Sequence, residues 1–119
     1  MNRLFAALAC FALAGCSVTA DDKPAWKDFA QASVDRYFVL NPNDAVYQGA
    51  HQFDGKLPDW SEAGLKEQAE FLHQLIDEAN AYEGLSDADE FERDYLVKVA
   101  EGELFWLEDA DQPLSLIHI

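Results

Sequence analysis

Two histidines are the side chains best suited to acid–base or metal chemistry in the body of this 119-residue chain. Glu70 and His73 stand at positions i and i+3, a spacing that puts both on one helix face and that di-iron helical bundles use. Such a site needs a second Glu-x-x-His motif, which the sequence lacks, so we interpret the two as a polar surface pair. His51 could form a local hydrogen bond with Asp54, and we assign His51 a structural or pocket-lining role.

The acidic residues form no motif with a defined chemistry. Asp87 and Asp89 resemble the start of a calcium loop, but Phe91 and Glu92 stand where that loop needs an oxygen ligand and a glycine. We therefore assign these acids to helix capping. The carboxylates near the carboxyl end are interpreted as a solvated face: Glu101, Glu103, Glu108, Asp109 and Asp111. The sequence has no nucleophile elbow, P-loop, dinucleotide-binding motif or His-Glu-x-x-His, so we expect no catalytic residue, metal site or cofactor within it.

The charge balance excludes two classes of partner. Asp and Glu number 23 against 8 Lys and Arg, which gives a formal net charge of -15. Nucleic acids and anionic lipid surfaces are both bound by basic patches. We therefore expect neither nucleic-acid binding nor polybasic membrane attachment. A hydrophobic fraction of 50% is ordinary for a globular protein and argues against wholesale disorder.

The amino-terminal segment has the features of a secretory signal. Arg3 supplies the positive charge, and residues 4–13 form an apolar run. At roughly ten residues this run is too short to cross a hydrocarbon core, which takes about 20. The run leads into Leu-Ala-Gly-Cys, which resembles the lipobox of bacterial lipoproteins. We therefore expect residues 1–15 to be a lipoprotein signal peptide and Cys16 to be the acylated residue.

Acylation of Cys16 implies an anchor and a location. Each buried methylene contributes about 0.8 kcal/mol, and several acyl chains hold a protein on a membrane stably. Residues 16–23 then form the lipidated cysteine and a short polar tether. Ser17, in place of an aspartate, resembles the sorting pattern of lipoproteins in the bacterial outer membrane that face the periplasm. Cys10 leaves with the signal peptide, so no thiol remains for a disulfide or for thiol catalysis.

Apolar residues recur at helical spacing in three segments, which predicts an all-α fold over residues 24–113. The first stripe spans residues 26–38, with Pro24 in the first helical turn. The second spans residues 65–79 and follows Ser61, a good N-cap residue. A capping-box variant at residues 86–89 opens a third helix, which is expected to run to about residue 108.

Two segments carry apolar residues in unusual number. Residues 41–61 have no period, and their large apolar groups predict a packed, ordered loop with a short helical turn near residues 44–48: Val46, Tyr47, Phe53, Leu57 and Trp60. The third helix carries two stripes, one with Phe91, Tyr95, Val99 and Trp106 and one with Leu96, Ala100, Leu104 and Leu107. We expect such a helix to be buried on more than one side, within a larger fold. Gly102 is expected to mark a close crossing by another helix.

The last six residues differ in character from the acidic stretch before them. Residues 114–119 read Leu-Ser-Leu-Ile-His-Ile, which resembles the translation of a transposon sequencing adaptor. We interpret them as a sequencing artefact and expect the authentic protein to continue beyond Pro113. His118 then takes no part in any site. The alternative is a native apolar tail.

Several motifs together resemble a known family. They lie at residues 37–42, 45–49, 92–96 and 102–108 and in the loop His51-Gln52-Phe53-Asp54-Gly55-Lys56-Leu57-Pro58-Asp59-Trp60-Ser61. The chain is similar here to the amino-terminal part of the bacterial domain-of-unknown-function family 885. That resemblance implies a large helical lipoprotein related to zinc carboxypeptidases, whose zinc-binding histidines and general-base glutamate lie downstream. No position of this chain matches that motif, so no catalytic or metal-binding residue is carried over.

These observations lead to one expected function and one alternative. We expect a truncated, lipid-anchored, periplasm-facing amino-terminal part of a zinc-dependent peptidase, itself non-catalytic and without zinc. The parent would hydrolyse peptides with a zinc-bound water. The membrane is then a partner through the acylated Cys16, and a peptide is the substrate of the parent only. The alternative is a complete small helical lipoprotein that acts as a binding module.

Overall fold

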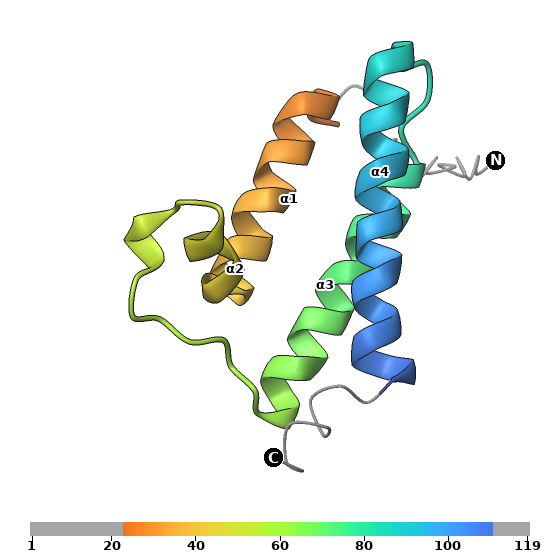
Figure 1. Cartoon of the computed structure of the whole chain (residues 1–119). Coiled ribbons are helices and arrows are strands. Elements are labelled where there is room, and N and C mark those ends of the chain that lie inside the picture. The colour runs from red at the N-terminus through yellow and green to blue at the C-terminus, as the bar shows by residue number, and fades with distance from the viewer. Residues whose placement is uncertain (1–22, 111–119) are drawn as a thin grey trace, which may run out of the picture.

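The computed structural model describes residues 23–110, which contain helices and no β-strand (Figure 1). The all-α prediction is therefore confirmed for this part of the chain. The elements in order are α1 (Trp26–Leu40), α2 (Pro42–Tyr47), the 3-10 turn η1 (His51–Phe53), α3 (Glu62–Asn80), α4 (Asp87–Leu104) and the π-helical turn η2 (Phe105–Asp109). None of the described helices is long and apolar enough to cross a membrane. The predicted signal peptide, Cys16 and residues 114–119 lie outside the described residues.

Proline and serine residues set the helix boundaries. α1 begins at Trp26 with Ala25 as its N-cap, so Pro24 precedes the helix and does not lie in its first turn as predicted. α1 ends where Asn41 leaves the helical region (φ -124°, ψ 67°), as expected for a residue before proline. Pro42 then starts α2, where its missing N–H costs nothing.

Two serine caps confirm the predicted starts of the long helices. The Ser61 hydroxyl accepts a hydrogen bond from the Gly64 backbone N–H at 3.2 Å. The Ser86 hydroxyl accepts from the Asp89 backbone N–H at 3.2 Å and donates to the Asp89 carboxylate at 2.7 Å. Asp89 thus stands where a capping box has its glutamate, but its carboxylate accepts from the Ser86 hydroxyl and not from the Ser86 backbone N–H.

The pairing of α3 with α4 is the main packing contact of the fold. The two helices run antiparallel (Figure 1) and share a core cluster of buried residues: Leu72, Leu75, Ala100 and Leu104. Ala100 is only 2% exposed, and its small side chain lets the two helices approach closely. Two apolar stripes were predicted on the third helix. The one that is buried is the inner stripe, which consists of Leu96, Ala100, Leu104 and Leu107.

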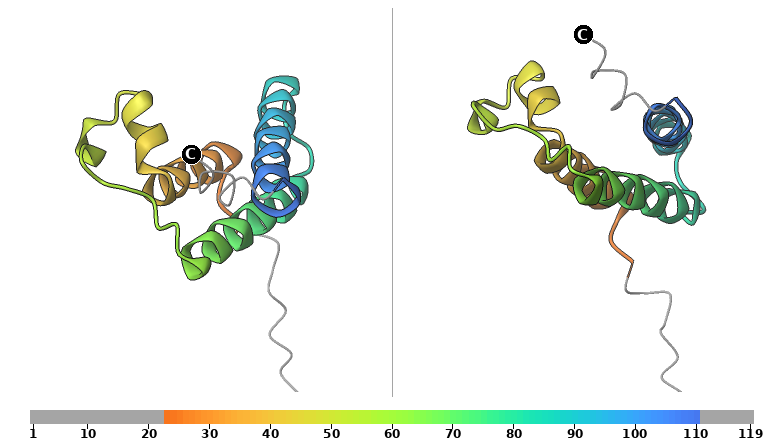
Figure 2. Two further views of the ribbon diagram at one scale, coloured as in Figure 1. Left: turned by 60° about the horizontal axis from the view of Figure 1, so that its bottom comes forward. Right: turned by 90° about the horizontal axis from the view of Figure 1, so that it is seen from below.

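Helix α1 joins this pair at one end through an aromatic cluster. Trp26 and Phe29 of α1 pack against Tyr82, with the rings of Trp26 and Tyr82 edge to face at 5.3 Å. The Trp26 indole N–H donates to Glu92 of α4 at 2.8 Å, and the Tyr82 hydroxyl donates to the Pro24 carbonyl at 2.9 Å. Away from this cluster α1 and α4 diverge, so the structure is open between them (Figure 2).

The loop before α3 is ordered, but most of its large side chains are not packed. Phe53 contacts Phe38 with ring centroids 6.4 Å apart, whereas Tyr47 is 92% exposed and Leu57 85% exposed. The prediction of a packed loop is wrong for these two. Backbone turns and α2 itself hold the segment in shape, with the predicted turn near residues 44–48 falling within and just after α2.

The end of the loop is held against the first turn of α3 by a close backbone contact. A Cβ at position 64 would lie 2.3 Å from the Asp59 carbonyl oxygen, so this approach requires glycine. Asp59 also accepts a hydrogen bond from the Ser61 backbone N–H at 2.9 Å, which lowers the pKa of its carboxyl group. This contact determines where Trp60 leaves the loop.

The outer stripe of α4 is exposed within the described residues, which show neither a second buried side of the helix nor a close crossing at Gly102. Phe91 is 75% exposed and Tyr95 65% exposed, so within residues 23–110 the helix is buried on one side only. Gly102 has no atom within 4 Å of a Cβ built there, so no described helix crosses at that point. The reason is that α1 contacts α4 near Glu92 and Val97 and leaves the outer stripe uncovered.

The α3–α4 core should dominate stability. We expect Leu72→Ala to lower the free energy of unfolding by about 2–5 kcal/mol, because a buried side chain is removed and a cavity is left. Urea unfolding followed by circular dichroism measures the change. Leu57→Ala is the matched control and should change stability by less than about 0.5 kcal/mol. Equal losses in both variants would contradict this description of the core and of the exposed loop.

Candidate functional site

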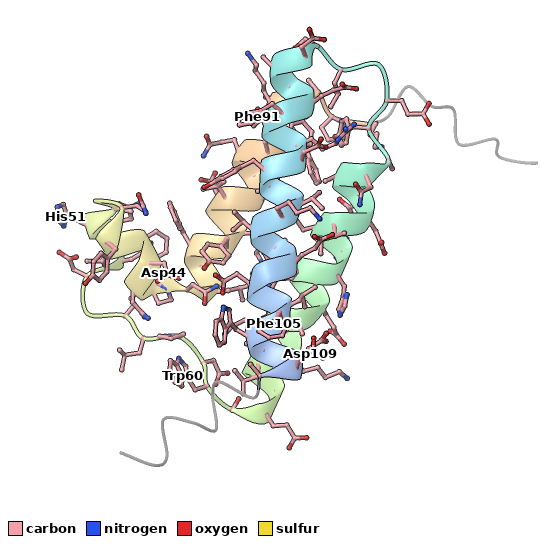
Figure 3. The ribbon with its side chains drawn as sticks, turned by 45° about the vertical axis from the view of Figure 1, so that its right-hand side comes forward. Asp44, His51, Trp60, Phe91, Phe105 and Asp109 are labelled. Carbon is pink, nitrogen blue, oxygen red and sulfur yellow. The ribbon has the colours of Figure 1, made fainter. Side chains whose placement is uncertain are left out.

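A cavity of 390 Å³ opens between α2, the loop before α3 and the end of α4. We call it the acidic cleft and define it by the lining residues Asp44, Trp60, Gln68, Glu103 and Trp106. Four helical elements and the loop each contribute one of these side chains. Figure 3 shows Asp44 on α2 and Trp60 on the loop, both toward the carboxyl-terminal end of α4.

Asp44 is held by a hydrogen bond from helix α1. The Tyr37 hydroxyl donates to the Asp44 carboxylate at 2.8 Å, across the junction between α1 and α2. Burial raises the pKa of Tyr37 far above its ordinary value, and the bond to Asp44 and the charge of Glu103 add to the effect. Tyr37 therefore remains a neutral donor that orients the Asp44 carboxylate.

Glu103 is a partly buried carboxylate that faces the same cleft. Burial is the main reason that its pKa is raised, and the negative charge of Asp44 raises it further. The interpretation of the carboxyl-terminal acids as a solvated face is therefore wrong for Glu103. The sequence does indicate the partial burial of Glu103. This residue lies three positions after Ala100 and four before Leu107, which places it beside the buried stripe of the helix.

The other acids of that run have separate roles on the surface. Glu101 accepts a hydrogen bond from Lys98 at 2.6 Å. The carboxylate of Glu108 lies 3.0 Å from the His73 Nε2 atom. Asp109 is exposed, and Asp111 lies outside the described residues. The prediction of a solvated face is confirmed for these described members of the run.

Gln68 places a buried amide in the wall of the cleft. The residue is 8% exposed and lines the cleft, and no buried side-chain polar atom among the described residues lacks a hydrogen-bond partner. An amide in such a position retains its capacity to donate and accept. Gln68 was missed in the sequence, although it lies three residues after Leu65 and four before Leu72 on the apolar stripe of α3.

The two predicted histidine sites lie elsewhere on the surface. Glu70 and His73 are both exposed, as expected, but they do not pair with each other. His73 contacts Glu108 and thereby connects α3 with η2, while Glu70 lies 3.5 Å from the Lys66 ammonium group. The predicted pair of Glu70 with His73 does not form, because η2 brings Glu108 close to His73.

His51 lies at the tip of the loop, far from the acidic cleft (Figure 3). Its side chain is 79% exposed, and its Nδ1 atom lies 3.5 Å from an Asp54 carboxylate oxygen. The expected hydrogen bond is therefore only a loose contact, and His51 does not line the acidic cleft. Within residues 23–110, no three His, Cys, Asp or Glu side chains come together in a group able to hold a metal ion.

A second, mainly apolar groove runs between α1, α3 and α4. It has a volume of 560 Å³, and its lining includes Tyr37, Phe38, Phe71 and Tyr95. The groove exists because α1 diverges from α4 beyond the aromatic cluster. Tyr37 lines this groove with its ring and donates its hydroxyl to Asp44 in the acidic cleft.

Comparisons with known proteins do not assign this site. Neither a protein-family model, nor a curated protein, nor a solved structure matches the chain. The resemblance to family 885 therefore stays a prediction.

The raised pKa of Glu103 predicts a pH-dependent effect on stability. Its folded-state pKa lies above the ordinary value of 4.5, so ionisation costs stability as pH rises through the raised value. We expect Glu103→Gln to raise the free energy of unfolding at pH 7 by less than about 1 kcal/mol, because Glu103 is partly screened by solvent. The gain should vanish below pH 4.5, where the carboxyl group is protonated in both states.

Urea unfolding of the variant and the wild type across this pH range measures the difference. Glu83→Gln is the matched control, since Glu83 is exposed and outside the acidic cleft. A Glu103→Gln variant that is less stable than the wild type at pH 7 would rule out a burial cost at this position.

Proposed function

We propose that this chain is the lipid-anchored, periplasm-facing amino-terminal helical region of a zinc-peptidase-like protein similar to family 885. One observation carries the proposal: the outer face of α4 is an exposed apolar stripe. Phe91, Tyr95 and Val99 recur every four residues and are 75%, 65% and 43% exposed. Spacing of this kind lets a second helix pack along the stripe.

The size of the exposed face supports a scaffold role. Phe105 and Trp106 extend the stripe onto η2, and each is about half exposed. Exposed apolar side chains that recur on one helix face are typical of an interaction site. In the proposed parent, further helices cover this face and α4 becomes a central helix, which is the environment that its two stripes predict.

The proposed anchor places the helical region close to the membrane. Six residues, 17–22, separate Cys16 from Lys23, where the described structure starts, and the seven steps between those two residues span at most about 25 Å. The formal charge of -15 disfavours contact with anionic lipid, so the body stands off the surface on its tether.

The zinc of the proposed parent has no place among the described residues. Residues 23–110 provide no group of three His, Cys, Asp or Glu side chains for a metal ion. The resemblance to family 885 assigns the zinc ligands and the general base to the downstream region of the parent. We assign no catalytic step to this chain.

The acidic cleft favours a second candidate, a complete small lipoprotein that acts as a binding module. A cavity lined by two carboxylates and the buried amide of Gln68 can hold a ligand without any further domain. The two candidates differ in what lies after residue 113 and in whether the α4 face is covered by another part of the same protein.

The genomic locus tests the proposal directly. We expect an independent clone, read without library adaptors, to show an open frame that continues past the Pro113 codon. That frame should encode a helix with a His-Glu-x-x-His-like motif. A native stop codon directly after Ile119 would reject the truncated-peptidase proposal and favour the binding module.

The exposed face of α4 can be tested on this chain alone. We expect the wild type to bind a dye for apolar surface and to self-associate in sedimentation velocity, because the stripe is uncovered. The double variant Phe91→Ser, Tyr95→Ser should lose most of this dye binding. Its free energy of unfolding should change by less than about 1 kcal/mol, since both side chains are largely exposed.

Tyr47→Ser is the matched control, because Tyr47 is 92% exposed but lies on α2, away from the stripe. It should leave dye binding unchanged. A monodisperse wild type that binds no dye would contradict an uncovered docking face.

A further inference from the structure

The apolar groove between α1, α3 and α4 continues at both ends into a neighbouring cavity. A cavity of 510 Å³ toward the start of α4 shares Val34, Tyr95 and Leu96 with the groove. At the other end, the Tyr37 side chain that lines the groove donates its hydroxyl to Asp44 in the acidic cleft. We call this continuous space the trough. It is open between α1 and α4 (Figure 2).

The length and the floor of the trough fit one α-helix. Its α4 wall runs from Glu92, which lines the first cavity, to Glu103, which lines the acidic cleft. At 1.5 Å per residue this stretch is about 16 Å long, or three helical turns. The floor is apolar and consists of Phe71, Leu72 and Leu75 of α3. A helix with one apolar face can therefore lie along the trough with that face on α3.

The charges along the trough are unevenly distributed. Near the start of α4, Lys27 and Glu92 line the same cavity, so their charges offset each other. At the other end, Asp44 and Glu103 line the acidic cleft together with no Lys, Arg or His. Neither of these two carboxylates forms a salt bridge within residues 23–110. A helix that complements the trough is therefore basic at the end that meets Asp44 and Glu103.

The course of the chain indicates where such a helix comes from. Trp106 and Leu107 of η2 line the acidic cleft, so the chain that leaves η2 starts at the acidic end of the trough. Helices joined by a short connection pack as antiparallel neighbours. The next helix can thus return along α4 with its first turn beside Asp44 and Glu103. The positive end of its dipole then faces these two carboxylates.

We propose that the trough is the docking site of the helix that follows η2 in the parent protein. This helix is amphipathic and antiparallel to α4, with its apolar face on α3 and with Lys or Arg in its first turn. The inference rests on the proposed function, because it requires a chain that continues beyond Pro113. It deepens that function by naming the segment that covers Tyr95, which belongs both to the trough and to the exposed stripe of α4.

The experiment builds the proposed connection on this chain. Three variants carry a designed helix of about 12 residues directly after Pro113, in place of residues 114–119. In the first, Leu residues at i, i+3, i+4 and i+7 form one face and two Lys stand in the first turn. In the second, two Glu replace the two Lys. The third has the composition of the first, with its Leu residues spread around the helix.

A nitroxide label in the last turn of each designed helix reports where that end lies. The readout is the broadening of the tryptophan indole N–H signals in NMR spectra of the chain in non-ionic detergent. Trp26 marks the far end of the trough, since its indole N–H donates to Glu92 at 2.8 Å. We expect the first helix to broaden the Trp26 signal strongly. The second should lose most of this effect through charge repulsion, and the third through loss of its apolar face.

Substitutions in the walls of the trough connect the docking to its residues. Tyr95→Ser should weaken docking of the first helix several-fold without unfolding the chain, because Tyr95 lines the trough and is 65% exposed. Tyr47→Ser is the matched control, since Tyr47 is exposed and lines no part of the trough. Glu103→Gln should weaken docking of the first helix and strengthen that of the second. Glu83→Gln, outside the trough, should change neither.

An unbroadened Trp26 signal with the first helix would overturn the inference, and so would equal broadening by the second or third helix. The genomic sequence after the Pro113 codon separates this inference from the proposed function. An open frame whose first helix is amphipathic and begins with Lys or Arg supports both. An open frame whose first helix lacks this pattern rejects the docked helix but leaves the parent in place. A native stop codon directly after Ile119 rejects both.

Discussion

The structure depends on the contact between the inner stripes of α3 and α4. Leu72 and Leu75 meet Ala100 and Leu104 there, and one alanine on each helix, Ala79 on α3 and Ala100 on α4, is almost completely buried. Small side chains at these positions let the backbones approach, so larger neighbours can interdigitate. Every other feature of the described residues, including the acidic cleft, is built on this helix pair.

Helix α1 is attached more loosely, and this has a functional consequence. Its aromatic cluster with Tyr82 closes one end of the fold, while the ion pair between Arg36 and Glu67 joins it to α3 farther along. Between α1 and α4 the helices diverge, which leaves the apolar groove and positions α2 opposite the end of α4. A tighter bundle would have filled the space that now forms the acidic cleft.

The α-helical elements were predictable because they depend on local chemistry. Ser61 and Ser86 cap the backbone N–H groups of the following turn, and Pro42 ends one helix and starts the next. Such interactions involve residues within four positions of each other, so they can be recognised without knowledge of the fold. The π-helical turn η2 at the end of α4 was not predicted, because one wider backbone turn leaves no clear sequence pattern.

The sequence by itself determined the starts of α3 and α4, the number of long helices and the excess of negative charge. Only the tertiary structure decided which stripe of α4 is buried, that Glu103 enters a cavity while Glu101 stays on the surface, and that His73 meets Glu108. Periodicity identifies apolar faces but carries no information on which neighbour covers each face. Which face is covered depends on where helices that are far apart in the chain cross one another. Those crossing positions are established only when the helices pack in the folded protein.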